Sequence, residues 1–165
     1  MTVRRDHRMS DQTFSSRLDR MVPGVPLGID EDLIRALVDD FYARVRSDPA
    51  IGPIFKARVE NWEPHLETMR DFWSSVVLMS GRYKGKPIEA HMPLGLRPTH
   101  FFRWLHLFEK AANDTCPPHA AQLFIVRAHK IARSLHRGLG IAEPSIETGA
   151  DPLPEILKPP DKLHP

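Results

Sequence analysis

The sequence has little cysteine and no long apolar run, and each shortage removes a class of protein. Its single thiol, Cys116, permits no internal disulfide, which excludes a disulfide-stapled fold and favours a reducing compartment. The longest aliphatic runs, 76–79 and 123–126, are far shorter than the roughly 20 residues that span a bilayer. The N-terminal arginines are followed by no apolar core of a signal peptide. We therefore expect a cytoplasmic protein without a membrane partner.

An excess of charge of either sign is also missing. The chain has 23 Lys and Arg against 21 Asp and Glu, for a formal net charge of +2. This balance is too close to neutral to indicate a nucleic-acid partner. A hydrophobic content of 41% and a charged content of 27% are ordinary for a globular protein. The length of 165 residues is enough for one domain with a sizeable core.

Both ends of the chain lack regular apolar spacing. Residues 1–27 are polar and mixed in charge, which predicts a disordered or loosely docked N-terminal tail. Six of the 16 prolines fall in residues 141–165. Because proline removes backbone donors and favours extended chain, this segment is predicted to be a second, Pro-rich disordered tail. The folded domain is then residues 28–140.

Between the tails, apolar residues recur at helical spacing. A first long helix should follow Asp30 as its N-cap and end before Pro49. A second is expected over about 61–79, and a third should begin with Thr99 as its cap. The last should end at Gly138. No convincing alternating strand is present, so the predicted fold class is all-α.

Four polar ring side chains lie on or beside these apolar stripes. Tyr42, His65 and Trp104 lie on the inward faces of the first three long helices, and His91 lies in a short segment bounded by prolines. Aromatic residues are concentrated on the same faces: Phe41, Phe55, Phe72, Trp73, Phe101, Trp104 and Phe108. A large flat apolar cofactor such as haem would explain this excess. Haem iron takes a neutral imidazole on one side, while a hydroxyl, imidazole or indole N–H on the other can donate to a ligand.

Taken singly, each of these residues has an ordinary explanation. A lone histidine on an apolar face is more often a satisfied core or surface histidine than a metal ligand. Tyr42 suits a core tyrosine whose hydroxyl reaches the surface, and Trp73 and Trp104 suit core packing. Spacing alone therefore leaves open both a haem pocket and a helical interaction module with an aromatic core.

Five blocks in the same order and register carry a resemblance to a known family. They are Phe41-Tyr42-Ala43-Arg44-Val45-Arg46 with Asp48-Pro49 and Gly52-Pro53-Ile54-Phe55, then Trp62-Glu63-Pro64-His65, Asp71-Phe72-Trp73, Tyr83-Lys84-Gly85-Lys86-Pro87-Ile88-Glu89-Ala90-His91, and Phe101-Phe102-Arg103-Trp104-Leu105. Over about 28–140 the chain resembles the truncated haemoglobins, specifically those of group III. Group III lacks the glycine motifs of other truncated haemoglobins, and no such motif stands out in this sequence.

The resemblance implies a truncated globin-like two-over-two helical sandwich around haem b, which is iron protoporphyrin IX. It implies that His91 is the proximal iron ligand. Tyr42, His65 and Trp104 match the distal ligand-binding positions. Phe41 and Phe55 match aromatic positions that pack near the porphyrin, and Phe72 and Trp73 match the aromatic pair of the distal helix. The resemblance thus implies that these four residues, with His91, bind the cofactor. His65 either binds iron itself or acts as a gate, and the sequence leaves both roles open.

The implied function is reversible binding of O2, with CO and NO as competing ligands, at a ferrous haem with a polar distal pocket. The alternative is a haem enzyme that converts NO to nitrate with O2, or that activates peroxide. Because no flavin or nicotinamide motif is visible, either reaction would need a separate reductase. A haem sensor ranks last, since no output domain is attached.

The remaining histidines are predicted to have no role in the site. His100 and His106 flank the face of Trp104, and His129 and His136 suit a solvated helix face. His7, His119 and His164 fall in predicted tails or loops.

Overall fold

The computed structural model describes residues 22–141. Most of both predicted tails lies outside the described residues, so the tails stay predictions. The described chain is built from helices and contains no strand, which confirms the all-α fold class. Its elements are η1 Val25–Leu27, α2 Glu31–Ser47, α3 Gly52–Arg58, α4 Trp62–Leu78, α5 Pro87–His91, η2 Met92–Leu94, α6 Pro98–Thr115 and α7 Pro118–Gly138. Within residues 22–141, no helix combines the length and the apolar character needed to cross a membrane.

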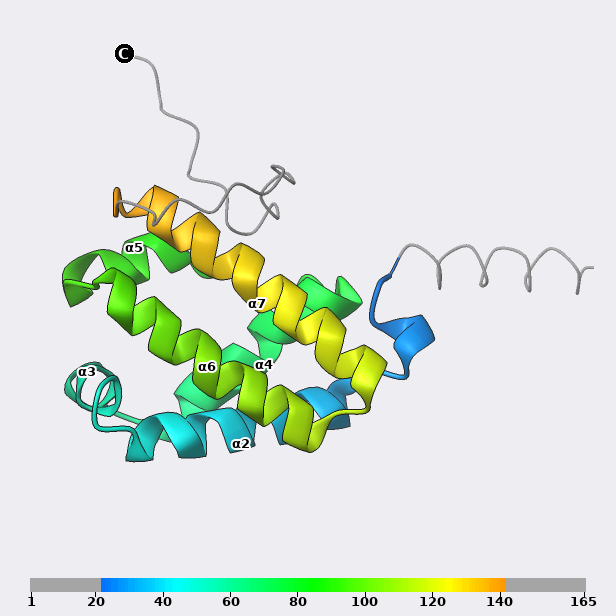
Figure 1. Cartoon of the computed structure of the whole chain (residues 1–165). Helices are drawn as coiled ribbons and strands as arrows, with labels where there is room; N and C mark the ends of the chain where they lie inside the picture. Colours follow the sequence, from blue (N-terminus) through cyan, green and yellow to red (C-terminus); the bar gives the residue numbers. More distant parts are fainter. Residues whose placement is uncertain (1–21, 142–165) are drawn as a thin grey trace, which may run out of the picture.

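The four long helices pack as two pairs. The connection between α6 and α7 is short, so these two helices run antiparallel side by side (Figure 1). Helix α2 packs against α4 within the other pair. The two pairs meet where α2 packs on α6 and α4 packs on α7. This arrangement is the two-over-two sandwich that the sequence blocks imply.

A stack of aromatic rings joins the two pairs. The ring of Phe108 on α6 lies 4.8 Å from Trp73 on α4 and 5.4 Å from Trp104, with interplanar angles of 19° and 13°. Phe41 on α2 meets Phe108 edge-on at 5.2 Å. Because Phe108 is only 1% exposed and contacts both pairs, it lies at the centre of the sandwich.

The starts of two helices test the capping predictions. Asp30 caps α2 as predicted, because its side chain accepts the backbone N–H of Leu33 at 2.9 Å. The prediction that Thr99 caps α6 is wrong: the helix begins at Pro98, with Arg97 as the N-cap residue. Proline suits the first helical position, since its φ is already fixed near the helical value and it has no N–H to satisfy.

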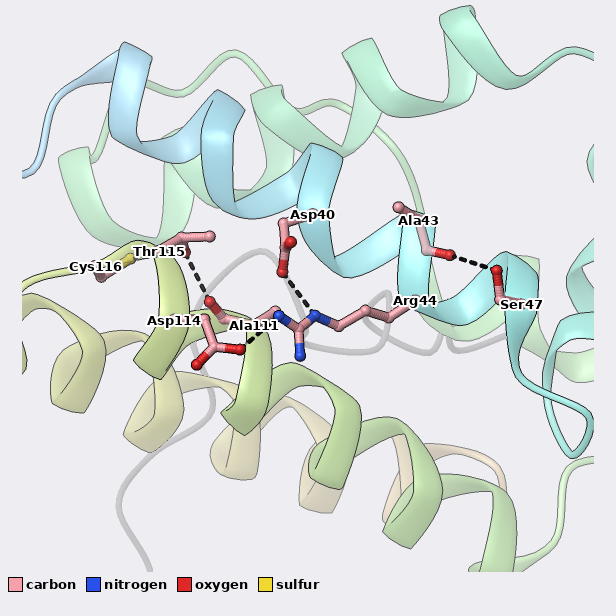
Figure 2. Close-up of polar contacts among 8 residues, drawn as sticks. All are labelled: Asp40, Ala43, Arg44, Ser47, Ala111, Asp114, Thr115 and Cys116. Atoms are coloured by element: carbon pink, nitrogen blue, oxygen red, sulfur yellow. Dashed lines mark hydrogen bonds and ion pairs between the residues drawn. The ribbon is translucent and has the colours of Figure 1, made fainter.

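Figure 2 shows how an ion pair ties α2 to α6. Arg44 on α2 donates to Asp40 at 2.7 Å and to Asp114 on α6 at 2.6 Å. The nearby hydroxyls of Ser47 and Thr115 donate to carbonyl oxygens four residues earlier in their own helices. Because Arg44 and Asp114 are solvent-accessible, we expect their ion pair to contribute less than about 1 kcal/mol.

A second ion pair, between a buried aspartate and a partly exposed arginine, lies at the turn between α2 and α3. The carboxylate of Asp48, whose side chain is 2% exposed, accepts from two nitrogens of Arg103 on α6 at 2.7 and 2.6 Å. It also accepts the backbone N–H groups of Ala50 and Ile51 at 2.9 and 3.1 Å. The hydrogen bond from Arg103, supported by those two backbone donors, holds the pKa of Asp48 below its usual value.

Replacing Asp48 by alanine should lower the free energy of unfolding by about 2–3 kcal/mol at pH 7, because it removes charge-assisted bonds from a buried turn. The folded-state pKa of Asp48 is depressed, so this stabilisation is full above the usual aspartate value of 3.8 and is lost as the pH falls through the folded pKa. Urea unfolding at pH 7 and pH 3 should therefore show a smaller difference between wild type and variant at pH 3. Asp114→Ala, which removes the exposed partner of Arg44, is the control. A difference that does not change with pH would contradict the prediction.

Candidate functional site

A cavity of about 590 Å³ lies within the helical sandwich and is lined by side chains from α2 to α7. Most of the lining side chains are apolar. In Figure 1, α5 lies at the top of the view and α2 and α3 lie at the bottom, and all three contribute to the lining. Cavities of this size and character bind small molecules and cofactors.

The structure brings the predicted site residues together, with one exception. Seven of them line the cavity: Tyr42, Phe55, His65, Phe72, Trp73, His91 and Trp104. Phe41 does not line it. Its ring is 1% exposed and packs behind Tyr42 and Trp104, at centroid distances of 4.9 and 5.6 Å.

His91 ends the short helix α5, and the carbonyl of Pro87 at the start of that helix fixes its ring. The Nδ1 of His91 donates to this carbonyl oxygen at 2.5 Å. Because a carbonyl oxygen can only accept, Nδ1 must carry a proton, and in the neutral ring Nε2 then keeps its lone pair. A neutral imidazole with one nitrogen held in this way is the form that binds a metal ion through the other nitrogen.

His65 on α4 is enclosed by aromatic rings. Its ring meets Tyr42, Trp62 and Phe55 edge-on at 5.3, 5.7 and 6.5 Å. The guanidinium of Arg46 covers Trp62 at 4.5 Å. Among residues 22–141, the buried Nε2 of His65 has no hydrogen-bond partner.

The electrostatic surroundings keep His65 neutral. Burial, and to a smaller extent the nearby imidazole of His91, lowers the pKa of His65. The imidazole is therefore uncharged at pH 7.

Two further hydrogen-bond donors line the cavity. Burial raises the pKa of Tyr42, so its hydroxyl stays protonated. The indole nitrogen of Trp104 can only donate. Within the described part of the chain, neither side chain makes a hydrogen bond to another residue. Both donors are thus free for a molecule in the cavity.

Sequence reasoning missed several lining residues. His100 lies one turn before Trp104 on the same face of α6, and that spacing is the signal that would have found it. Arg58 at the end of α3 and Tyr83 in the loop after α4 also line the cavity. No periodic pattern marks these two, because connections between helices place them.

Comparison with known proteins agrees with this geometry. The family of bacterial-like globins matches residues 26–136. The group 3 truncated haemoglobin ctb of Campylobacter jejuni subsp. jejuni serotype O:2 is 34% identical over 109 residues, which cover 63% of this chain and 86% of that protein.

Two solved structures share the fold. The group III truncated haemoglobin from Campylobacter jejuni superposes with a TM-score of 0.63 at 32% identity, covering 67% of this chain and 91% of that one. The group II truncated haemoglobin from Bacillus anthracis gives a TM-score of 0.60 at 25% identity, covering 78% and 95%. The chain therefore belongs to the bacterial-like globin family, as a truncated haemoglobin of group III.

Proposed function

We propose that this chain holds one haem b in the cavity through His91 and reversibly binds O2, with CO and NO as competing ligands. The single observation that carries the proposal is the hydrogen bond from His91 Nδ1 to the carbonyl of Pro87, which leaves Nε2 as a free metal ligand. Membership of a globin family supports the same cofactor and the same class of diatomic ligand.

The cavity residues fit a flat aromatic macrocycle. The volume of about 590 Å³ is suited to a large cofactor, and the rings of Phe55, Phe72 and Trp73 supply apolar walls. Haem held by one imidazole supplies an iron with one position open to a diatomic ligand. The buried, unpartnered Nε2 of His65 and the free donors of Tyr42 and Trp104 suit a polar ligand in the same space.

The distal side chains act on the diatomic ligand through hydrogen bonds. The hydroxyl of Tyr42 and the indole N–H of Trp104 donate to it and slow its escape. Neutral His65 offers one N–H and one lone pair, so it serves as a further donor, as an iron ligand or as a gate. The last two roles stay predictions.

Replacing Tyr42 or Trp104 by phenylalanine should raise the O2 release rate, up to about tenfold for each, because each change removes one hydrogen bond worth roughly 0.5–1.5 kcal/mol. Stopped-flow measurement of O2 release from the haem-loaded chain tests this. Tyr83→Phe is the matched control, since Tyr83 also lines the cavity but its ring contacts Phe72 rather than Tyr42. Unchanged release in both distal variants would exclude the proposed donors.

The ferric absorption spectrum decides the role of His65. Direct ligation by His65 predicts a low-spin spectrum that becomes high-spin in His65→Ala. A gating role predicts high-spin spectra in both proteins and faster CO association in the variant. The ring contacts with Tyr42, Trp62 and Phe55 hold His65 in the pocket, so we expect the variant to differ from wild type in one of these two ways.

Measuring NO consumption distinguishes reversible O2 binding from the enzymatic alternative. With O2 and an added reductase present, a binding protein should consume little NO beyond one equivalent per haem. Continuous NO consumption with an added reductase would favour the enzyme. The separate reductase and the cytoplasmic location stay predictions.

A further inference from the structure

His100 lies in the first turn of α6 and lines the same cavity as His91, yet the proposed function does not use it. Two hydrogen bonds fix it to the start of the helix. Its Nδ1 accepts the backbone N–H of Arg97 at 3.0 Å, and its own backbone N–H donates to the carbonyl of Arg97 at 3.0 Å.

These contacts give His100 the opposite tautomer to His91. A backbone N–H can only donate, so Nδ1 of His100 must hold a lone pair. In the neutral ring the proton is then on Nε2. His91 thus offers a lone pair at Nε2, whereas His100 offers an N–H there. The first arrangement suits a metal ion, and the second suits an acceptor such as a carboxylate.

Two arginines lie on or next to the lining of the cavity and are suited to an anion. Arg58, at the end of α3, lines the cavity, is exposed and has no ion pair within residues 22–141. Arg97 is exposed and adjoins His100 through the capping bonds. One acidic residue, Glu60, also lines the cavity and is exposed on the connection after α3. Arg58 on the lining and Arg97 beside His100 thus supply two positive charges, against the one negative charge of Glu60.

We propose that the Nε2–H of His100 donates a hydrogen bond to a carboxylate on the edge of the bound cofactor. The inference rests on the proposed haem b, whose two propionate side chains are its carboxylates. This hydrogen bond gives His100 a second task besides capping α6. It also determines which edge of the macrocycle faces the start of that helix.

Two substitutions separate the two tasks of His100. His100→Asn keeps an oxygen where Nδ1 lies, so it preserves the cap but has no group that reaches the position of Nε2. His100→Gln has an amide nitrogen that reaches that position, and glutamine at the third helical position can also accept the N–H of Arg97, so this variant keeps both tasks. His106→Asn is the control, since His106 is exposed on the same helix and does not line the cavity.

The experiment measures haemin transfer from the loaded full chain to an excess of a haem-scavenging apoprotein, followed at the Soret band. His100→Asn should lose haemin about threefold to tenfold faster than wild type, while His100→Gln and His106→Asn should lose it at nearly the wild-type rate. Iron protoporphyrin IX dimethyl ester, which lacks the carboxylates, should leave wild type and His100→Asn at the same rate.

The outcomes distinguish this inference from the proposed function. If wild type takes up haemin and His100→Asn releases it at the wild-type rate, the inference is overturned and the proposed function stands. Equal acceleration for haemin and for the dimethyl ester also overturns it, because the effect would then come from the protein rather than from the carboxylates. A wild-type chain that takes up no haemin overturns both.

Discussion

Replacing His91 by glycine should weaken haemin retention by about a hundredfold or more, and millimolar imidazole should restore the Soret band. Loss of a residue that only orients a metal ligand costs about 10–100-fold, so loss of the ligand itself should cost at least as much. Glycine leaves a space the size of the missing ring, into which free imidazole fits. Because His91 is the last residue of α5, glycine at this position should cost the helix little.

Absorption spectra and haemin transfer rates, with and without imidazole, check this prediction. His129→Gly is the control: His129 is exposed on α7, contacts Glu109 at 2.7 Å and does not line the cavity. It should retain haemin like wild type. If His91→Gly holds haemin as firmly as wild type without imidazole, His91 is not the ligand, and His65 becomes the candidate.

Local sequence patterns predicted the long helices well, because helical spacing records which face of each helix is buried. The site residues were instead assigned from the resemblance of five sequence blocks to the truncated haemoglobins. The prediction for Phe41 shows the limit of this reasoning. Phe41 and Tyr42 are neighbours on α2, so their side chains point about 100° apart around the helix. Both are buried, but only Tyr42 lines the cavity, while Phe41 packs against Phe108. Burial could be predicted from the pattern, whereas the choice between cavity and core could not.

Contacts between distant parts of the chain could also not be predicted from local sequence patterns. The partner of Asp48 is Arg103, 55 residues later, and no local pattern pairs them. The cavity position of His100 depends on where α6 begins. With Thr99 as the predicted cap, the side-chain bond that fixes the tautomer of His100 would not have been expected.

Truncating Phe108 to alanine should lower the free energy of unfolding by about 3–5 kcal/mol, the largest stability effect that we expect in this chain. The ring is 1% exposed and touches Phe41, Trp73 and Trp104, so its loss leaves a cavity between the two helix pairs. Phe102→Ala is the control: Phe102 is on the same helix but 53% exposed, and its truncation should change stability by less than about 0.5 kcal/mol. Urea unfolding of the two variants measures the difference, and equal midpoints would contradict the central place of Phe108.

The ring of Phe108 affects both the stability of the fold and the release of the ligand. Phe108 stacks on Trp104, whereas Phe124 is equally buried but contacts Trp73 at 5.7 Å and makes no ring contact with Trp104. Phe108→Leu and Phe124→Leu are milder changes that should keep the chain folded and destabilise it to similar extents. Only Phe108→Leu removes the ring that supports the indole donor, so only this variant should release O2 faster than wild type. Similar acceleration in both variants would mean that general loosening of the core, rather than the support of Trp104, controls release.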